Sequence, residues 1–267
     1  MSAVALERRP AVQARVIVAL AQRALAVQLR RAQFLIPALV LPLVLLAVIA
    51  SGTSAGRNLP GFPTSGSYIG FVIGGALLQG ALLAGMTAGT AMAGDIEGGF
   101  FDRLLAAPVH RASIVLGRVV ASLVVGAAQA CLFLAVGLIF GADYAGGVLG
   151  VTAAVVLTAM VAGAAAGATG ALALRTGSVE LLRNFFPMVF VLLFTAPAFF
   201  PRQLLSPAMH AVTRFNPLTY VVEGIRAVLH DDRALGSPAA GFACAAGLLT
   251  GATALAVLAM RARTRGA

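Results

Sequence analysis

Residues 148–174 read VLGVTAAVVLTAMVAGAAAGATGALAL, a stretch without a single charged side chain. At 1.5 Å per residue, a helix of this length exceeds the roughly 30 Å thickness of a bilayer core. Five other stretches are apolar enough to be candidate spans, so the six predicted spans lie near 34–50, 67–93, 114–140, 148–174, 185–200 and 239–260. The sequence therefore predicts an all-α, polytopic membrane protein with six transmembrane helices.

The composition of the whole chain agrees with a membrane protein. Of its 267 residues, 60% are hydrophobic and only 10% are charged, whereas soluble domains average roughly a quarter charged residues. All nineteen cations are arginine, and the net charge is +10. Because these arginines lie at the ends of apolar stretches, they suit membrane topology and anionic lipid headgroups better than a nucleic-acid surface.

The distribution of arginine predicts the orientation in the membrane. With the N-terminus inside, fourteen arginines fall on the cytoplasmic side and five on the outer side, which favours two cytoplasmic termini in a plasma or inner membrane. The predicted cytoplasmic arginines are Arg8, Arg9, Arg15, Arg23, Arg30, Arg31, Arg103, Arg111, Arg118, Arg175, Arg183, Arg261, Arg263 and Arg265. The predicted outer ones are Arg57, Arg202, Arg214, Arg226 and Arg233.

The chain divides into three parts on this reading. Residues 1–33 are a cytoplasmic tail that includes an amphipathic helix near 11–31, and the polar residues of that helix return to one face, as in helices that lie in the membrane interface. A basic tail without fixed structure is the alternative for this segment. Residues 34–260 form one transmembrane domain, and residues 261–267 form a second cytoplasmic tail.

Residues that could support chemistry in this chain are few. A phosphate-binding P-loop requires lysine, and the chain has none. Cys131 and Cys244 lie within apolar stretches, which argues against a disulfide or a zinc site, and the three histidines show no spacing typical of metal ligands. We therefore expect no catalytic residue, metal or cofactor here, and no hydrolysis of ATP by this chain.

The predicted spans also lack the groups that ion-coupled transporters and intramembrane enzymes use. No Asp, Glu or His lies in any of the six, although such side chains usually form ion ligands, proton relays or catalytic groups at membrane depth. Four milder polar residues are candidates to line a passage: Gln79, Thr87, Thr90 and Gln129. Hydrogen bonds between helices are the alternative role for them. Pairs of glycines spaced as GxxxG, among them Gly85 and Gly89, predict closely packed helices.

The cytoplasmic connection between the second and third spans is too long for a simple turn. Asp95 and Glu97 precede an apolar group, Phe100, Phe101, Leu104 and Leu105, with basic residues at Arg103 and Arg111. Acids at the start and bases at the end favour a short helix that ends or bends near Pro108. An exposed apolar ridge on such a helix would dock a partner protein, or would rest on lipid.

Two segments resemble the ABC-2 family of ABC-exporter permeases, most closely the daunorubicin-resistance type of drug-export subunit. They are DIEGGFFDRLLAAPVHRASIVLGR at 95–118 and FNPLTYVVEGIR at 215–226. The resemblance implies that 95–112 form the coupling helix that fits a cleft on a cytoplasmic ATPase, with these residues at the contact: Asp95, Glu97, Gly98, Phe100, Arg103, Leu104, Leu105, Pro108 and Arg111. It also implies a partly re-entrant extracellular segment at 201–235 that carries Asn216, Pro217, Leu218, Thr219, Tyr220, Glu223 and Arg226.

The same resemblance implies the function and the partners. The chain would move a hydrophobic or amphipathic drug or antibiotic out of the cell, with ATP and Mg²⁺ bound by two copies of a separate ATPase subunit. A second permease, identical or paralogous, would complete the assembly. The alternatives are export of a lipid or glycan by a permease of the same family, and a passive channel or scaffold.

Overall fold

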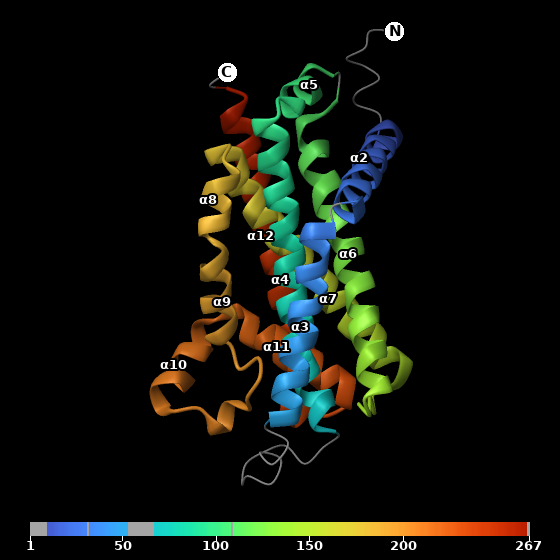
Figure 1. The fold of residues 1–267 in the computed structure, drawn as a ribbon, viewed down its shortest axis with the longest axis vertical. Helices are drawn as coiled ribbons and strands as arrows, with labels where there is room; N and C mark the ends of the chain where they lie inside the picture. Colours follow the sequence, from blue (N-terminus) through green and yellow to red (C-terminus); the bar gives the residue numbers. More distant parts are fainter. Residues whose placement is uncertain (1–9, 31, 53–66, 108, 266–267) are drawn as a thin grey trace.

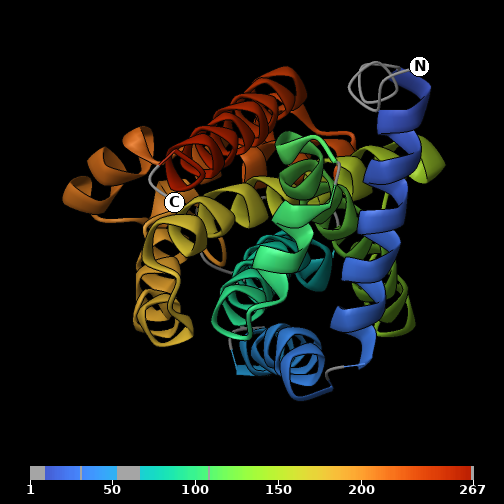
Figure 2. The same cartoon turned by 90° about the horizontal axis from the view of Figure 1, so that it is seen from above.

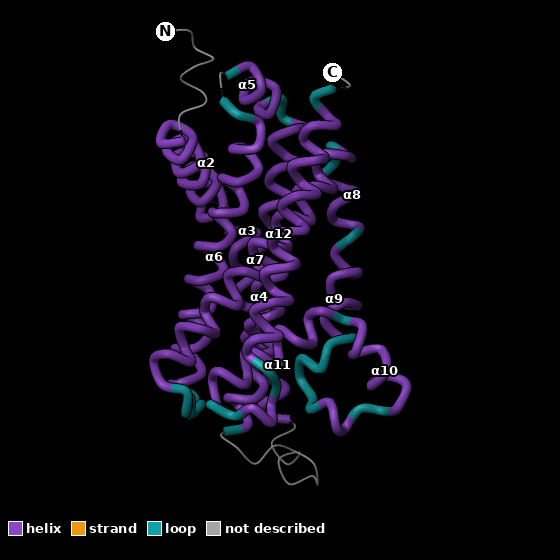
Figure 3. The backbone as a smooth tube through the Cα atoms, turned by 180° about the vertical axis from the view of Figure 1, so that it is seen from behind, coloured by secondary structure: helices purple, strands orange, loops and turns teal. Residues whose placement is uncertain are grey.

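The computed structural model describes residues 10–30, 32–52, 67–107 and 109–265, and within these ranges every regular element is a helix (Figure 1). The tube view from behind shows the same arrangement, with long helices joined by short loops (Figure 3). The predicted all-α fold is therefore confirmed. Pro108 of the predicted coupling helix and four of the counted arginines lie outside the described residues: Arg8, Arg9, Arg31 and Arg57.

Four of the predicted spans are long, apolar helices: α4 (Tyr68–Glu97), α6 (Arg111–Ile139), α7 (Gly147–Thr176) and α12 (Pro238–Arg263). Helix α4 lies at the centre of the bundle, and 94% of its most apolar window is buried inside the chain, against 17% for α12. It packs against α3, α6, α7 and α11, whereas α12 leaves most of its surface for lipid.

Small residues allow α4 and α7 to pack closely. A Cβ atom at Gly85 would lie 2.3 Å from Ala165 Cβ, and one at Gly89 would lie 2.4 Å from Thr169 Cβ. The Thr169 hydroxyl lies 2.9 Å from the Gly85 carbonyl and donates a hydrogen bond across the helix contact. The predicted GxxxG contact at Gly85 and Gly89 is thus confirmed, and its partner is α7.

The first and fifth predicted spans differ from the other four. Helix α3 (Ala32–Gly52) covers the first and, unlike the long helices, contains two internal prolines, Pro37 and Pro42. Of the fifth, predicted at 185–200, only α9 (Phe186–Phe194) is helical, and residues 195–200 form turns and bends. A short helix, α8 (Val179–Asn184), precedes α9 and is separated from it at Phe185. Pro187 in the first turn of α9 has no N–H to donate to the preceding turn, which explains the break.

The N-terminal helix α2 (Pro10–Arg30) forms where an amphipathic helix was predicted. Its composition also meets the length and hydropathy of a short span, over Val12–Arg30. Seen from above, however, α2 lies across the bundle rather than along it (Figure 2). This orientation is the one expected of a helix at the membrane surface. The starts of α2 and α5 (Phe100–Ala106) and the end of α12 lie at one end of the molecule, which we call the α5 end.

Short helices close the opposite end, which we call the α11 end. They are η2 (Arg202–Leu204), α10 (Pro207–Phe215), α11 (Pro217–His230) and η3 (Arg233–Leu235). Helix α11 crosses behind α4 and packs against α4, α7 and α12, whereas α10 projects to the side (Figure 1). The predicted short helices between the fifth and sixth spans are therefore present.

Candidate functional site

The turn between α4 and α5 is organised by one carboxylate. Asp95, in the last turn of α4, accepts from Arg118 of α6 and from Arg23 of α2, the latter at 3.3 Å. The Asp95 and Arg118 side chains are only 13% and 12% exposed, while Arg23 is 36% exposed. Three helices that are distant in sequence therefore meet at this carboxylate.

Asp95 and Glu97 do not stand at the start of the coupling helix, so the prediction that they complement its dipole was wrong. Both belong to the end of α4, where the carbonyl dipoles disfavour an acid, rather than to the start of the coupling helix. Arginines compensate Asp95. The Glu97 carboxylate instead accepts from the backbone N–H of Val179, at 2.8 Å, and so stabilises the N-terminus of α8.

Helix α5 is fixed to the bundle by its aromatic side chains. The chain reverses at Gly99, whose φ of 68° is readily adopted only by glycine. Phe101 is fully buried, and the Phe100 ring carries the Arg23 guanidinium 3.6 Å from its centroid. A cation at that position interacts favourably with the ring face.

The exposed surface of α5 differs from the expected apolar ridge. Leu104 and Leu105 are half-buried and pack against the chain's own core, as Phe101 does. The exposed side chains of α5 are Asp102, Arg103 and Ala106. Of the expected ridge, Phe101 is buried and Phe100, Leu104 and Leu105 are partly buried, so the fully exposed surface of α5 is mainly polar.

Charge is distributed unequally between the two ends. Among the described residues, eleven arginines and four acids lie on the side that holds α2 and α5. The side that holds α10 and α11 has four arginines and four acids. On the α5 side, Arg103, Arg111, Arg175, Arg183, Arg261 and Arg265 are all exposed. This end therefore presents a basic surface.

The residues of the second motif, at the start of α11, bind the chain to itself. The Asn216 side chain accepts from Leu218 N–H at 2.9 Å, which caps α11, and donates to the Leu192 carbonyl of α9 at 2.7 Å. Thr219 and Tyr220 donate from their hydroxyls to carbonyls at the end of α10. These contacts fix the angle between α10 and α11 and hold both helices against the end of α9. The motif residues at this junction are Asn216, Pro217, Leu218, Thr219 and Tyr220.

Arg226 is the most tightly held cation of the structure's described part, with 2% of its surface exposed. Its guanidinium donates to the carbonyls of Phe71 at 3.0 Å, Pro197 at 2.8 Å and Ala198 at 2.5 Å. It also lies 3.7 Å from the centroid of the Phe71 ring. The Pro197 and Ala198 carbonyls follow the end of α9, so Arg226 supplies the donors that a continued helix would have supplied.

Glu223 balances the charge near Arg226. Its carboxylate lies 3.6 Å from an Arg202 guanidinium nitrogen, and Arg202 also donates to Thr213 at 3.2 Å. Burial raises the pKa of the Glu223 carboxyl, and the charges of Arg202 and Arg226 act in the opposite direction. This network is structural, and within the described ranges no three His, Cys, Asp or Glu side chains gather as a metal site requires.

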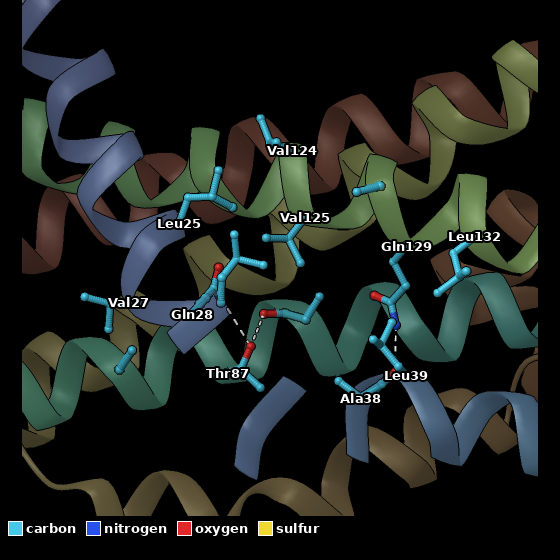
Figure 4. Close-up of a pocket in the computed structure, with 14 residues that line it drawn as sticks. Leu25, Val27, Gln28, Ala38, Leu39, Thr87, Val124, Val125, Gln129 and Leu132 are labelled. Atoms are coloured by element: carbon cyan, nitrogen blue, oxygen red, sulfur yellow. Dashed lines mark hydrogen bonds between the residues drawn. The ribbon is translucent and has the colours of Figure 1, made fainter. Parts of the chain in front are cut away.

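The four candidates for a passage separate into different environments. Thr87 and Gln129 line a cavity between α2, α3, α4 and α6 (Figure 4). Thr90 faces two pockets beside α8 and α9, and Thr87 also lines one of these. Gln79 is buried, and neither polar atom of its side chain has a hydrogen-bond partner. The structure therefore does not bring the four into one lining.

Gln129 has a structural role that sequence reasoning left open. Pro42 has no N–H, so the carbonyl of Ala38 loses the donor that a regular helix would supply. The Gln129 side chain donates to that carbonyl at 2.6 Å. The interhelical hydrogen bond, the alternative to passage lining, is thus present for this residue.

Arg23 and Arg118 are the residues of the α4–α5 site that the sequence did not single out, and Phe101 was expected on an exposed ridge rather than in the core. Arg118 carried a usable signal, because it is a charged residue inside the predicted span 114–140. A charge at that depth requires a partner. Phe101 and Arg23 gave no such signal, since their roles depend on how α5 and α2 lie against the bundle.

Two comparisons with known proteins bear on these sites. A family model described as "ABC-2 type transporter" matches residues 15–230, a range that includes most of α2, the α4–α5 turn and the whole of α11. A protein of Porphyra purpurea named "Putative transport permease ycf38" is 25% identical over 211 residues. That alignment covers 79% of this chain and 72% of the relative.

Proposed function

Since the chain belongs to the ABC-2 type transporter family, we propose that it is the membrane permease subunit of an ATP-driven exporter. Its cargo is a hydrophobic or amphipathic compound such as a drug or antibiotic, and its closest functional type is the daunorubicin-resistance class. The chain itself binds neither ATP nor Mg²⁺ and catalyses no reaction. Two copies of a separate ATPase subunit bind the nucleotide, and a second permease chain completes the transporter in the cytoplasmic membrane.

The observation that carries this proposal is the way α5 is mounted. A short helix projects at the basic end of the bundle and is tied through Phe100 and Asp95 to α2, α4 and α6. A push on α5 by a partner would therefore reach three helices at once. The excess of arginine on this side favours a cytoplasmic location, where a nucleotide-hydrolysing partner would be.

The docking contact expected from this geometry is electrostatic at its centre. Arg103 is exposed on α5, and Arg111 is exposed at the start of α6, so the partner would present acidic groups there. The inward-facing Leu104 would then support the helix rather than touch the ATPase. Export of an apolar cargo is favoured by spans without acidic side chains, which offer no site for a strongly cationic compound.

The test is copurification of an ATPase with the tagged permease from its own cells. We expect a stoichiometric ATP-binding-cassette subunit with the unchanged chain, and ATP hydrolysis only in the fractions that contain both. Arg103→Glu should remove the partner without loss of folded permease, because Arg103 is exposed. Arg214→Glu is the matched control, since Arg214 is an equally exposed arginine at the α11 end.

The proposal would be wrong if no such ATPase accompanied the permease under conditions that keep it monodisperse. It would also be wrong if the isolated chain hydrolysed ATP. Equal recruitment by Arg103→Glu and Arg214→Glu would leave the exporter assignment in place but would remove α5 from the docking contact.

A further inference from the structure

A cavity of about 310 Å³ lies between the C-terminal half of α2 and helices α3, α4 and α6 (Figure 4). Small-molecule pockets in proteins occupy roughly 300–1,000 Å³, so the space is sufficient for part of an amphiphile. Of the described residues that line it, none is charged, and three are polar: Gln28, Thr87 and Gln129. The rest are Leu, Val and Ala.

The mouth of the cavity opens toward lipid. Val124, Ala128 and Leu132 line it on successive turns of α6, and all three are exposed at the surface of a membrane-span helix. Leu29 of α2, also exposed, lies on the same rim. An occupant would therefore arrive from the bilayer rather than from water, and it would have to be uncharged to enter without a large desolvation cost.

One polar atom at the cavity is left without a partner. Gln28 is 9% exposed, and its Oε1 atom is buried and accepts no hydrogen bond. The Thr87 hydroxyl donates to the Ala84 carbonyl at 2.7 Å, so the Thr87 oxygen can only accept from Gln28 Nε2, at 3.3 Å. This arrangement fixes the Gln28 amide with its NH₂ group on Thr87 and its oxygen turned away from it (Figure 4).

The other two polar groups do not serve that oxygen. The Gln129 amide nitrogen is engaged by the Ala38 carbonyl, and the single hydrogen of Thr87 is engaged by Ala84. A buried acceptor without a donor is unfavourable, and the missing donor can be supplied by a ligand. The ligand implied is one whose chain suits an apolar space and whose head carries a hydroxyl or an amide N–H.

We propose that this cavity is a binding site for an uncharged amphiphile from the surrounding leaflet, with its hydrocarbon chain among the leucines and valines and its hydroxyl or amide donor on Gln28 Oε1. The site is formed by one chain and depends neither on the ATPase nor on the exported cargo. It lies directly beneath α2, so an occupant would contact both that helix and the central helix α4.

Photo-crosslinking tests the site with two probes that share one acyl chain bearing a diazirine. One is a monoacylglycerol, whose head donates hydrogen bonds, and the other is the methyl ester, whose head cannot. In phosphatidylcholine nanodiscs, we expect the monoacylglycerol to label peptides of α2, α4 and α6 about three- to tenfold more than the ester, as one neutral hydrogen bond predicts. Gln28→Met should reduce labelling by the monoacylglycerol to that by the ester.

Ala128→Phe provides an independent test, because it fills the exposed mouth without entering the core. It should reduce labelling by both probes. Ala254→Phe is the matched control: it places the same ring in an apolar groove of about 630 Å³ between α6 and α12, where no described residue has an unpaired buried polar atom. This control should leave labelling of the α2–α4–α6 cavity unchanged.

Three results would overturn the proposal. Equal labelling by both probes in the unchanged protein would mean that the acyl chain alone determines binding, as it does for any lipid. Stronger labelling by the corresponding free fatty acid would contradict the requirement for an uncharged head. Undiminished labelling in Ala128→Phe would place the bound acyl chain outside this cavity. This result can be read even if Gln28→Met fails to fold.

Discussion

Removal of the charge on Asp95 should loosen the α5 end and reduce binding of the ATPase. Asp95→Asn keeps the shape of the side chain but removes the negative charge that both Arg118 and Arg23 contact. Loss of one partner from a buried ion pair costs about 3–5 kcal/mol, and an exposed pair contributes only about 0.2–1 kcal/mol. With Asp95 and Arg118 at 13% and 12% exposure, the expected cost is intermediate, about 2–3 kcal/mol.

The two arginines should not be equivalent. Arg118→Gln should cost nearly as much as Asp95→Asn, because the Arg118–Asp95 contact is the more buried of the two. Arg23→Gln should cost about 1 kcal/mol, since Arg23 is 36% exposed and contributes one surface pair and one ring contact. The double variant Asp95→Asn/Arg118→Gln should cost less than the sum of its single changes, because both changes remove the same ion pair.

The assay is the fraction of detergent-solubilised protein that stays monodisperse after heating. For a chain of this size, 1 kcal/mol corresponds to about 2–4 °C, so Asp95→Asn should lower the midpoint by about 4–12 °C. Less ATPase should copurify with it at a temperature where it is still folded. A midpoint unchanged by Asp95→Asn, or a larger loss for Arg23→Gln than for Arg118→Gln, would refute the argument.

Three further predictions concern the bundle. Arg226→Lys should lower the free energy of unfolding by about 2 kcal/mol or more, and with it the heating midpoint, because one ammonium cannot reproduce the fork of a guanidinium held by three carbonyls. An unaltered midpoint would contradict this. Gln129→Leu should cost about 1–2 kcal/mol, and less in a Pro42→Ala background, where an N–H at position 42 replaces the side-chain donor; equal losses would exclude that role. In intact cells lacking other reactive cysteines, Cys at Ala234 should react with an impermeant thiol reagent and Cys at Ala106 should not; the reverse pattern would invert the orientation.

Much of the fold was predictable because a bilayer allows few alternatives. Apolar stretches without charge must form helices, so the bounds of α4, α6, α7 and α12 follow those of the predicted spans within a few residues. The glycine spacing at Gly85 and Gly89 correctly predicted a close helix contact, although not its partner. The fifth span failed because hydropathy does not register where a helix ends: α9 stops at Phe194, and residues 195–200 of the predicted span are not helical.

The site was less predictable, for a physical reason that α5 illustrates. A helix of seven residues has an apolar and a polar face, and the sequence cannot say whether the apolar face meets a partner or the chain's own core. Leu104 and Phe101 meet the core, so the surface that remains for the proposed docking contact is the one that carries Arg103. The role of Asp95 in joining α2, α4 and α6 likewise depends on where α2 lies. The pattern of apolar residues in the sequence does not give that position.

The arginines show why a count along the sequence combines two different populations. Arg226 was counted as an outer positive charge, yet it is buried on three carbonyls, and Arg202 is paired with Glu223. These charges have partners within the fold. They would therefore cross the membrane together with the folded α11 segment, and they carry little information about the orientation of the chain. With the acids included, the described residues of the α11 end balance, and those of the α5 end retain an excess of seven arginines. The asymmetry that favours a cytoplasmic α5 end therefore remains when the structural arginines are set aside.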